Sequence, residues 1–177
     1  MSKTILIGSP NSGKSLLFNR LTGLNQKVAN FPGVTVNINS GKSLDHPTNE
    51  FLDFPGAYSL QTISGEEKIA VDAFYTALND PEISTVICVV DVTRLEKGLI
   101  FALQVINACA EQQKPLVIAA NMIDVLEQHS LNLDITGLEK ALGVPVIPVS
   151  AKSGSGLEQL QDKAINHREM PTAYSSD

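Results

Sequence analysis

Short, continuously apolar runs alternate along the chain with longer segments in which apolar residues recur at helical spacing. The run T-V-I-C-V-V-D at residues 85–91 shows the first kind most clearly. Such a run is typical of a strand that is covered on both faces of a sheet, so Cys88 within it is predicted to be a buried thiol. Six segments are predicted as strands: residues 4–7, 36–44, 50–53, 85–91, 115–120 and 144–149.

The segments between these strands have the pattern of helices. Five are predicted: residues 14–21, 66–78, 94–112, 138–142 and 156–167. The buried side of the first would be formed by Leu16, Leu17, Phe18 and Leu21. Residues 24–35 contain Asn, Gly and Pro and are predicted as a loop, and residues 54–65 are predicted as a second loop. This alternation predicts an α/β fold: a mostly parallel six-stranded sheet with one antiparallel strand and helices on both faces.

Length and composition fit one globular domain. Of the 177 residues, 43% are hydrophobic. This fraction is too high for a disordered chain and is typical of a globular one. We expect the domain to span residues 1–168 and residues 169–177 to form a polar linker or frayed end. No run approaches the ~18 apolar residues of a membrane helix, so a cytoplasmic domain is expected. The net charge of −6 argues against unspecific nucleic-acid binding.

A glycine-rich motif follows the first strand and opens the first helix. Residues 8–15 read G-S-P-N-S-G-K-S, which matches the phosphate-loop pattern G-x-x-x-x-G-K-S/T in full. Glycines let the backbone N–H groups turn inward toward an anion, and the helix N-terminus adds partial positive charge. Lys14 would reach the β- and γ-phosphates, and the Ser15 hydroxyl would ligate Mg²⁺.

Two later motifs specify the base. N-M-I-D at residues 121–124 follows a predicted strand, and S-A-K at residues 150–152 follows the last one. The Asp124 carboxylate can accept hydrogen bonds from N1–H and the N2 amino group of guanine, a donor pair that adenine lacks. Asn121 would hold the base and brace the phosphate loop, and a backbone N–H of the S-A-K segment would contact the guanine O6.

Two segments between the phosphate loop and the base motifs predict a nucleotide-dependent switch. Asp53, in D-F-P-G, would hold Mg²⁺ through water, and the Gly56 N–H would bond the γ-phosphate. That bond exists only with a triphosphate, so the loop can change state on hydrolysis. Thr35, in N-F-P-G-V-T, is the candidate second Mg²⁺ ligand. Residues 24–35 are called the first switch segment and residues 53–60 the second.

These five elements, in this order, resemble the Ras-like P-loop GTPases of the TrmE–Era–septin type. The combination of G-S-P-N-S-G-K-S, N-F-P-G-V-T-V, D-F-P-G-A-Y-S-L and N-M-I-D resembles the N-terminal G domain of bacterial ferrous iron transport protein B (FeoB), over about residues 3–168. The residues expected to contact GTP or GDP are Gly8, Ser9, Pro10, Asn11, Ser12, Gly13, Lys14, Ser15, Leu16, Gly33, Val34, Thr35, Asp53, Gly56, Asn121, Met122, Asp124, Ser150, Ala151 and Lys152. Of these, Asn11, Lys14, Thr35 and Gly56 are expected to act in hydrolysis.

The resemblance implies partners that residues 1–177 do not include. FeoB proteins carry a helical inhibitor domain and a membrane permease domain after the G domain, and the full-length protein lies in the bacterial inner membrane. A small accessory Feo protein and a second copy of the chain are further candidate partners. The implied role is a GTP-dependent switch that regulates ferrous iron uptake.

Slow hydrolysis is expected of the isolated domain. Ala57 occupies the place where many GTPases have a water-positioning Gln, and residues 24–35 contain no Arg and one Lys, Lys27. Resemblance to the potassium-activated members of the class implies that Asn11 helps to hold K⁺ beside the phosphates, with backbone carbonyls around residues 29–31. The alternative is that Asn11 only caps the loop.

Other interpretations stay open at this point. A nucleic-acid-associated assembly GTPase of the Era or TrmE type is disfavoured by the acidic balance, by Met122 and by the V-T-V segment. A nucleotide-gated binding module with incidental turnover stays open because of Ala57 and the absence of Arg from residues 24–35. Glu66 and Glu67 fit a solvated helix start better than a contact with a partner domain, and Asp91 fits a structural cap. Tyr58 is interpreted as an anchor that holds the second switch segment by packing.

Overall fold

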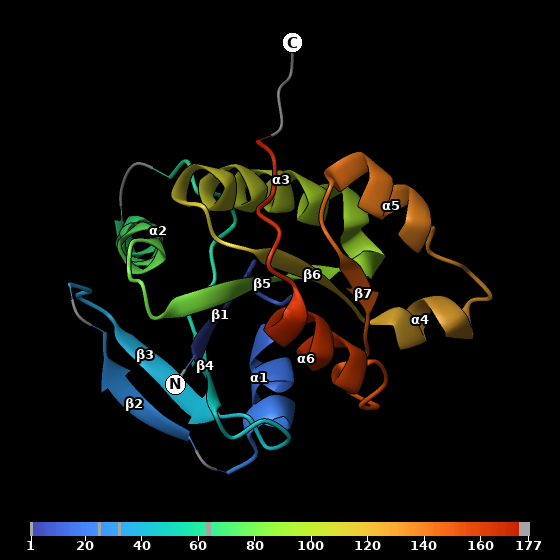
Figure 1. The fold of residues 1–177 in the computed structure, drawn as a ribbon. Coiled ribbons are helices and arrows are strands. Elements are labelled where there is room, and N and C mark those ends of the chain that lie inside the picture. Colours follow the sequence, from blue (N-terminus) through green and yellow to red (C-terminus); the bar gives the residue numbers. More distant parts are fainter. Residues whose placement is uncertain (1, 25, 32, 63–64, 174–177) are drawn as a thin grey trace.

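The structure, a computed structural model, describes residues 2–24, 26–31, 33–62 and 65–173 (Figure 1). Seven strands form one sheet in the order β2-β3-β4-β1-β5-β6-β7. The strands are β1 Ser2–Gly8, β2 Gln26–Asn30, β3 Asn37–Lys42, β4 Asn49–Asp53, β5 Ile83–Asp91, β6 Leu116–Asn121 and β7 Val146–Pro148. The mostly parallel α/β fold is therefore confirmed.

β3 is the strand that runs against the others. It pairs antiparallel with β2 on one side and with β4 on the other, whereas β1 pairs parallel with both β4 and β5. One antiparallel strand was predicted and is confirmed. A sheet of six strands was also predicted, and that number is wrong.

The additional strand is β2, which lies in the segment predicted as a loop. Its sequence, Q-K-V-A-N, has no apolar run, and Val28 is 65% exposed. β2 is an edge strand that forms through backbone pairing with β3, from Gln26 opposite Gly41 to Asn30 opposite Asn37. A hydrophobic pattern cannot reveal a strand that buries so little apolar surface.

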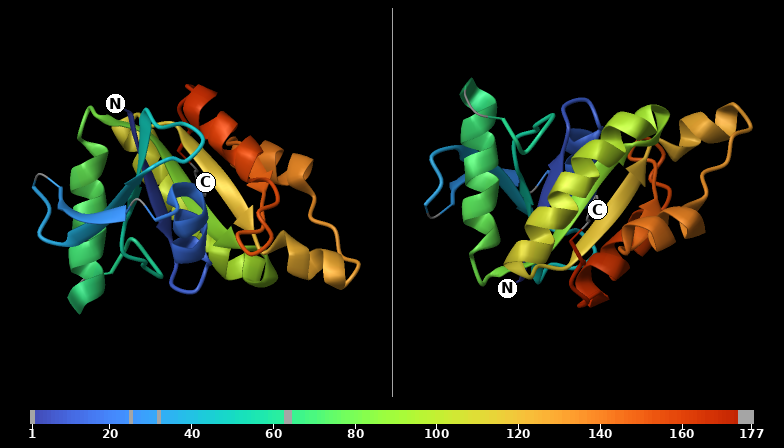
Figure 2. Two further views of the ribbon diagram at one scale, coloured as in Figure 1. Left: turned by 90° about the horizontal axis from the view of Figure 1, so that it is seen from below. Right: turned by 90° about the horizontal axis from the view of Figure 1, so that it is seen from above.

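Helices cover both faces of the sheet (Figures 1 and 2). They are α1 Lys14–Thr22, α2 Gly65–Leu78, α3 Leu95–Gln112, α4 Ile123–Gln128, α5 Ile135–Leu142 and α6 Leu157–Asn166, with the 3₁₀ helix η1 at Val92–Arg94. Five of them match the predicted helices in place. α4 was not predicted, because it is six residues long and contains no buried residue.

Alternating side chains of the central strand divide the core into two layers. Ile5 and Ile7 of β1 pack with the cluster that contains Phe74 of α2 and Phe101 of α3. Leu6 points to the opposite face and packs with Phe18 of α1 and with other residues of a second cluster. The two-residue period of a strand therefore anchors the helices on both sides of β1.

The buried thiol predicted at Cys88 is confirmed. Cys88 is 0% exposed, and desolvation raises its pKa to about 12. Burial also raises the pKa of Cys109. Both thiols therefore stay protonated at neutral pH and serve as small apolar core residues.

The end of the chain beyond α6 has no helix or strand in its described part, residues 167–173. The rest of the tail predicted as linker, residues 174–177, lies outside the described residues. No helix in the part of the chain that the structure describes is long and apolar enough to cross a lipid bilayer.

The sheet brings the predicted motifs to one edge. The parallel strands β1, β4, β5 and β6 end at Gly8, Asp53, Asp91 and Asn121, respectively. Because carboxyl ends of parallel strands meet at the same edge, the loops that follow them lie together. Ligand sites of open α/β sheets occupy this edge.

Candidate functional site

The phosphate loop turns between β1 and α1 through two left-handed residues. Asn11 has φ 68° and Gly13 has φ 85°. A Cβ atom on Gly13 would lie 2.2 Å from Asn121 Nδ2, so this position has no room for a side chain. Asn tolerates the left-handed region better than most residues, which explains its place at position 11.

The N-terminus of α1 follows the phosphate loop directly and presents its first backbone N–H groups there. Gly13 caps the helix without a side-chain hydrogen bond, and the first turn contains no acidic residue. The first N–H groups of a helix lack intrahelical partners and carry partial positive charge. This end of α1 is therefore suited to an anion, as the motif predicts.

Lys14 and Asp53 form an ion pair across the site. The Lys14 ammonium donates to the Asp53 carboxylate, and each side chain is only 9% exposed. The structure thus brings together the predicted phosphate ligand and the predicted Mg²⁺ ligand. A phosphate that enters the loop would compete with Asp53 for the Lys14 ammonium.

The cavity beside the loop is lined by residues of the loop, the start of α1 and Gly56. The Ala57 N–H donates to the Gly8 carbonyl at 3.3 Å, and a Cβ atom on Gly56 would lie 3.1 Å from Pro10 N. Gly56 therefore lies directly against the phosphate loop. Leu16 also lines this cavity and is 47% exposed, although the helical pattern predicted it to be buried.

The first switch segment lies apart from this cavity. Thr35 is exposed, and its side chain has no hydrogen-bond partner among the described residues. Gly33 lies near α2, since a Cβ atom there would be 3.2 Å from Thr76 Cγ2. Phe31 packs edge-on against Phe54, with ring centroids 6.3 Å apart. This arrangement places the segment against α2 and leaves Thr35 out of the cavity lining.

Asn121 connects the phosphate loop to the base motifs. Its Nδ2 donates to the Ser12 carbonyl at 3.0 Å, and its Oδ1 accepts from the Ala151 N–H at 3.0 Å. The side chain is 2% exposed. The predicted bracing of the phosphate loop is confirmed, and the second bond fixes the S-A-K segment as well.

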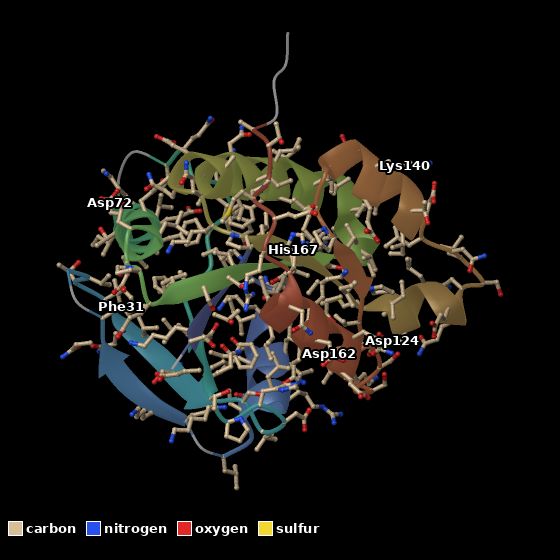
Figure 3. The ribbon with its side chains drawn as sticks, in the orientation of Figure 1. Phe31, Asp72, Asp124, Lys140, Asp162 and His167 are labelled. Carbon is tan, nitrogen blue, oxygen red and sulfur yellow. The ribbon has the colours of Figure 1, made fainter. Side chains whose placement is uncertain are left out.

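Asp124 lies in the first turn of α4 and is half-buried (Figure 3). The helix is capped by Met122, whose φ of 70° turns the chain sharply after β6. The Ile123 N–H donates to the Val149 carbonyl at 3.1 Å, which ties N-M-I-D to the segment before Ser150. The two predicted base motifs are therefore neighbours.

Arg20 contributes to this arrangement and was not singled out from the sequence. Its Nε donates to the Ala151 carbonyl at 2.9 Å, and its guanidinium also contacts the Lys152 carbonyl. Arg20 lies in the last turn of α1, where a surface arginine is common. Nothing in its spacing reveals a bond to a loop 131 residues away along the chain.

The second switch segment is held by two side chains. The Glu67 carboxylate accepts from the Tyr58 N–H and from the Ser59 N–H, the latter at 3.3 Å. The Gln104 side-chain oxygen accepts from the Leu60 N–H at 2.6 Å and from the Ser59 hydroxyl at 3.2 Å. The segment is therefore fastened to both α2 and α3.

These contacts correct two interpretations. Glu67 was interpreted as a residue of a solvated helix start, but its carboxylate binds the backbone of the second switch. Tyr58 was interpreted as an anchor by packing, but it is 65% exposed. The predicted capping role of Asp91 is confirmed, because its carboxylate accepts from the Thr93 N–H at 2.8 Å.

Replacing Gln104 by Leu is expected to loosen the second switch. The Leu60 N–H loses its acceptor at nearly constant side-chain volume, at a cost of about 1 kcal/mol. Amide exchange at Leu60 should accelerate by about fivefold, as measured by NMR. Gln112→Leu, on the same helix, should leave that rate unchanged. Equal exchange in Gln104→Leu and in the unmodified chain would contradict the assigned role.

The fold and the site define a Ras-like P-loop GTPase. The sheet order, the phosphate loop between β1 and α1, and the two base motifs tied together by Asn121 are its structural elements. A sequence profile described as "Ferrous iron transport protein B" matches residues 2–164. The chain therefore belongs to the FeoB family, as its G-domain segment.

Individual relatives agree with this assignment. The Fe(2+) transporter FeoB of Leptospira biflexa is 41% identical over 157 residues, which are 88% of this chain and 22% of that protein. A crystal structure of an S. thermophilus NFeoB E67A mutant bound to GDP has a TM-score of 0.83 at 38% identity, covering 96% of this chain and 63% of that one. The same mutant bound to GDP.AlF4⁻ has a TM-score of 0.82 at 38% identity, covering 100% and 67%. This chain thus spans about a fifth of the length of the FeoB transporter it matches.

Proposed function

We propose that residues 1–168 form a G domain that binds GTP and GDP, hydrolyses GTP slowly and changes the state of its switch segments in doing so. The observation that carries this proposal is the pair of hydrogen bonds made by Asn121. One reaches the phosphate loop and the other reaches the S-A-K segment. A nucleotide whose phosphates contact the phosphate loop and whose base contacts the S-A-K segment would therefore be held in one fixed geometry.

Guanine selection is assigned to Asp124. The carboxylate is half-buried beside Met122, which lies next to the phosphate loop, because a Cβ atom on Gly13 would be 3.5 Å from the Met122 methyl carbon. Guanine would satisfy both carboxylate oxygens through N1–H and the N2 amino group. Adenine would leave them without donors in a partly dehydrated place, which is costly. The segment Ser150, Ala151 and Lys152 would donate a backbone N–H to the guanine O6. The Ser150 N–H donates to the Ser155 carbonyl and the Ala151 N–H to Asn121, whereas the Lys152 N–H has no such partner among the described residues.

The donor set at the phosphates suits Mg²⁺. Ser15 is exposed in the first turn of α1, and Asp53 presents a carboxylate from the end of β4. Hydroxyl, carboxylate and water oxygens are the ligands that this hard cation takes. Bound there, Mg²⁺ would neutralise charge on the β- and γ-phosphates. Thr35 would add its hydroxyl once the first switch segment moves from α2 toward the phosphates.

Lys14 would also neutralise charge on the β- and γ-phosphates. Its ammonium would leave Asp53 for the phosphate oxygens, and Asp53 would then be free to orient a metal-bound water. The Gly56 N–H, which lies against the phosphate loop, would donate to the γ-phosphate. Loss of that phosphate removes this bond and releases the second switch.

Potassium stimulation is part of the proposal. Asn11 is exposed at the mouth of the cavity, and its side chain has no hydrogen-bond partner among the described residues. Its amide oxygen is therefore available to a cation beside the phosphates. K⁺ there would supply the positive charge that an arginine supplies in other GTPases, which suits a switch loop without Arg.

Single-turnover hydrolysis in K⁺ and in Na⁺ tests both hydrolysis and its stimulation. We expect GTP to be converted to GDP at least about tenfold faster in K⁺, since the cation replaces one charge-stabilising contact. Asn11→Gly, which keeps the left-handed backbone, should remove the difference between the salts. Asn11→Ala is less suitable because its side chain is strained at φ 68°. Equal rates in both salts for the unmodified chain would refute the potassium role.

The iron-uptake role follows from family membership. A FeoB relative named as an Fe(2+) transporter is about four times as long as this chain. We propose that the G domain lies on the cytoplasmic side of the bacterial inner membrane and regulates an attached permease domain, with the helical inhibitor domain between them. A small accessory Feo protein and a second copy of the chain are further proposed partners; no nucleic-acid partner is proposed.

A second function is favoured by Ala57, which is 1% exposed and has no polar side-chain atom beside the phosphate loop. A nucleotide-gated binding module would need no water-positioning group there. The same single-turnover experiment separates the two: no GDP formed in K⁺ over hours, with GTP bound throughout, would favour the binding module.

A further inference from the structure

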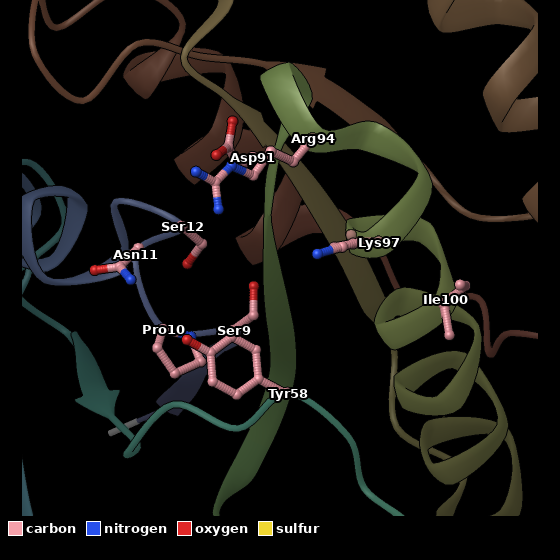
Figure 4. Close-up of a pocket in the computed structure, with 10 residues that line it drawn as sticks. Ser9, Pro10, Asn11, Ser12, Tyr58, Asp91, Arg94, Lys97 and Ile100 are labelled. Atoms are coloured by element: carbon pink, nitrogen blue, oxygen red, sulfur yellow. The ribbon is translucent and has the colours of Figure 1, made fainter.

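A second pocket lies beside the phosphate loop, on the side that faces α3 (Figure 4). Its volume is ≈ 350 Å³. Residues 9–12 of the loop form one wall, Tyr58 of the second switch another, and Arg94, Lys97 and Ile100 of η1 and α3 a third. It shares residues 9–11 with the phosphate cavity but contains neither Lys14 nor Ser15. The two cavities are therefore distinct.

The charge of this pocket is positive in an acidic chain. Arg94 and Lys97 are exposed at its rim, and neither has a hydrogen-bond or ion-pair partner among the described residues. The carboxylate among the lining residues is Asp91, which accepts from both the Thr93 N–H at 2.8 Å and the Thr93 hydroxyl at 2.6 Å. Figure 4 shows the Arg94 guanidinium and the Lys97 ammonium directed toward the phosphate loop.

A buried hydroxyl without a partner lies in the wall opposite these cations. Ser12 is 1% exposed, and its Oγ has no hydrogen-bond partner in the described structure. Buried polar atoms are nearly always paired, so this hydroxyl would gain a partner from a ligand in the pocket. Because less than 1 Å² of the atom is exposed, the Ser12 side chain would have to turn toward the pocket to make that bond. The Ser9 hydroxyl also lines the pocket and lies near Ser12 in Figure 4. Hydroxyls and cations together form a donor set for an anion.

The remaining wall is apolar. Tyr58 is 65% exposed and Ile100 is 56% exposed, and both lie at the pocket. Exposed side chains of this size offer a flat surface to the body of a ligand. A pocket of this volume with an apolar wall and a few convergent polar groups has the character of a small-molecule site.

We propose that this pocket binds a small organic anion. A phosphate or carboxylate group would lie between Arg94, Lys97 and the serine hydroxyls of the loop, and an apolar body would rest on Tyr58 and Ile100. Because the ligand would contact the phosphate loop and the second switch at once, it would restrain Tyr58 and so hold the second switch in the arrangement seen here. This site goes beyond nucleotide binding and does not depend on hydrolysis.

Phenyl phosphate is a suitable probe because it combines both features. The 177-residue chain is first saturated with GDP and Mg²⁺, so that the phosphate cavity is filled, and GDP affinity is measured separately for every variant. Phenyl phosphate is then titrated and followed by NMR at the amides of residues 9–12 and 94–100. Benzoate tests a carboxylate in place of the phosphate, inorganic phosphate lacks the apolar body, and phenol lacks the charge.

We expect saturable binding of phenyl phosphate that is at least about fivefold tighter than that of inorganic phosphate or of phenol. Arg94→Gln and Lys97→Gln should each weaken it about fivefold or more, since each removes a charge-assisted contact. The matched exposed cations in Lys140→Gln and Arg168→Gln should leave it unchanged. Absence of saturation at millimolar phenyl phosphate, or binding unaffected by both pocket variants, would overturn the proposal. Failure of the unmodified chain to bind GDP would instead refute the proposed nucleotide function.

Discussion

Asp124→Asn should transfer the base preference of this domain from guanine to xanthine. The amide cannot accept from both N1–H and the N2 amino group, so the two charge-assisted hydrogen bonds to the carboxylate are lost. Each such bond contributes about 1.5–3 kcal/mol, which predicts a loss of GDP affinity of about 10²–10⁴-fold. Xanthine carries an oxygen in place of the N2 amino group and can accept from the new amide. Equilibrium titration with GDP and XDP measures both changes.

Asp124→Ala is the control for this exchange. It removes the carboxylate without supplying a donor, so GDP affinity should fall by a similar factor while XDP gains nothing. Lys152→Ala, in the neighbouring S-A-K segment, keeps the backbone groups assigned to the base and should change GDP affinity far less. Unchanged GDP binding by Asp124→Ala would show that residues other than Asp124 recognise the guanine base.

Lys14→Met is expected to have two large effects with different causes. GDP affinity should fall by about 10²-fold or more, because the charge-assisted bonds to the phosphates disappear. The nucleotide-free protein should also lose stability, because the Asp53 carboxylate, only 9% exposed, is left without its cation. Removing one partner of a buried ion pair costs about 3–5 kcal/mol in the free energy of unfolding. Urea denaturation without nucleotide measures this second effect.

The double variant Lys14→Met/Asp53→Asn separates the two causes. It removes both charges of the pair, so most of the lost stability should return while GDP affinity stays low. Lys68→Met, which breaks the exposed pair with Asp72, is the matched control and should change the free energy of unfolding by less than about 1 kcal/mol. A stability loss that persists in the double variant would show that Lys14→Met destabilises the protein through lost packing and not through the unpaired charge of Asp53.

The sequence could predict the parallel core of the fold because that core is built from apolar runs. The run at residues 85–91 became β5, buried on both faces, and the glycine motif at residues 8–15 lies between β1 and α1. β2 was not predicted because it is an edge strand that forms through backbone pairing and leaves Val28 exposed. A hydrophobic pattern carries information about burial, and β2 buries too little to be seen.

The site was predictable where its chemistry has a fixed spacing and not where it depends on contacts between distant segments. Asn121 was expected to brace the phosphate loop, and its bond to Ser12 does so. The attachment of the second switch by Glu67 and Gln104 was missed, since a polar residue on a helix surface gives no sign of what lies opposite. Arg20 was missed for the same reason. Tertiary packing decides these contacts, and the spacing of residues in a single sequence does not show which distant segments contact each other.

Equilibrium titration of the nucleotide-free chain with GTP and with ATP, each with Mg²⁺, tests the central claim most directly. The chain should bind GTP, and ATP should bind at least about 10²-fold more weakly, because adenine offers no donor pair to Asp124. Prior addition of GDP should block GTP, since both would use the same loops. Equal affinity for GTP and ATP, or binding of neither, would contradict the assignment of this chain as a guanine-nucleotide switch.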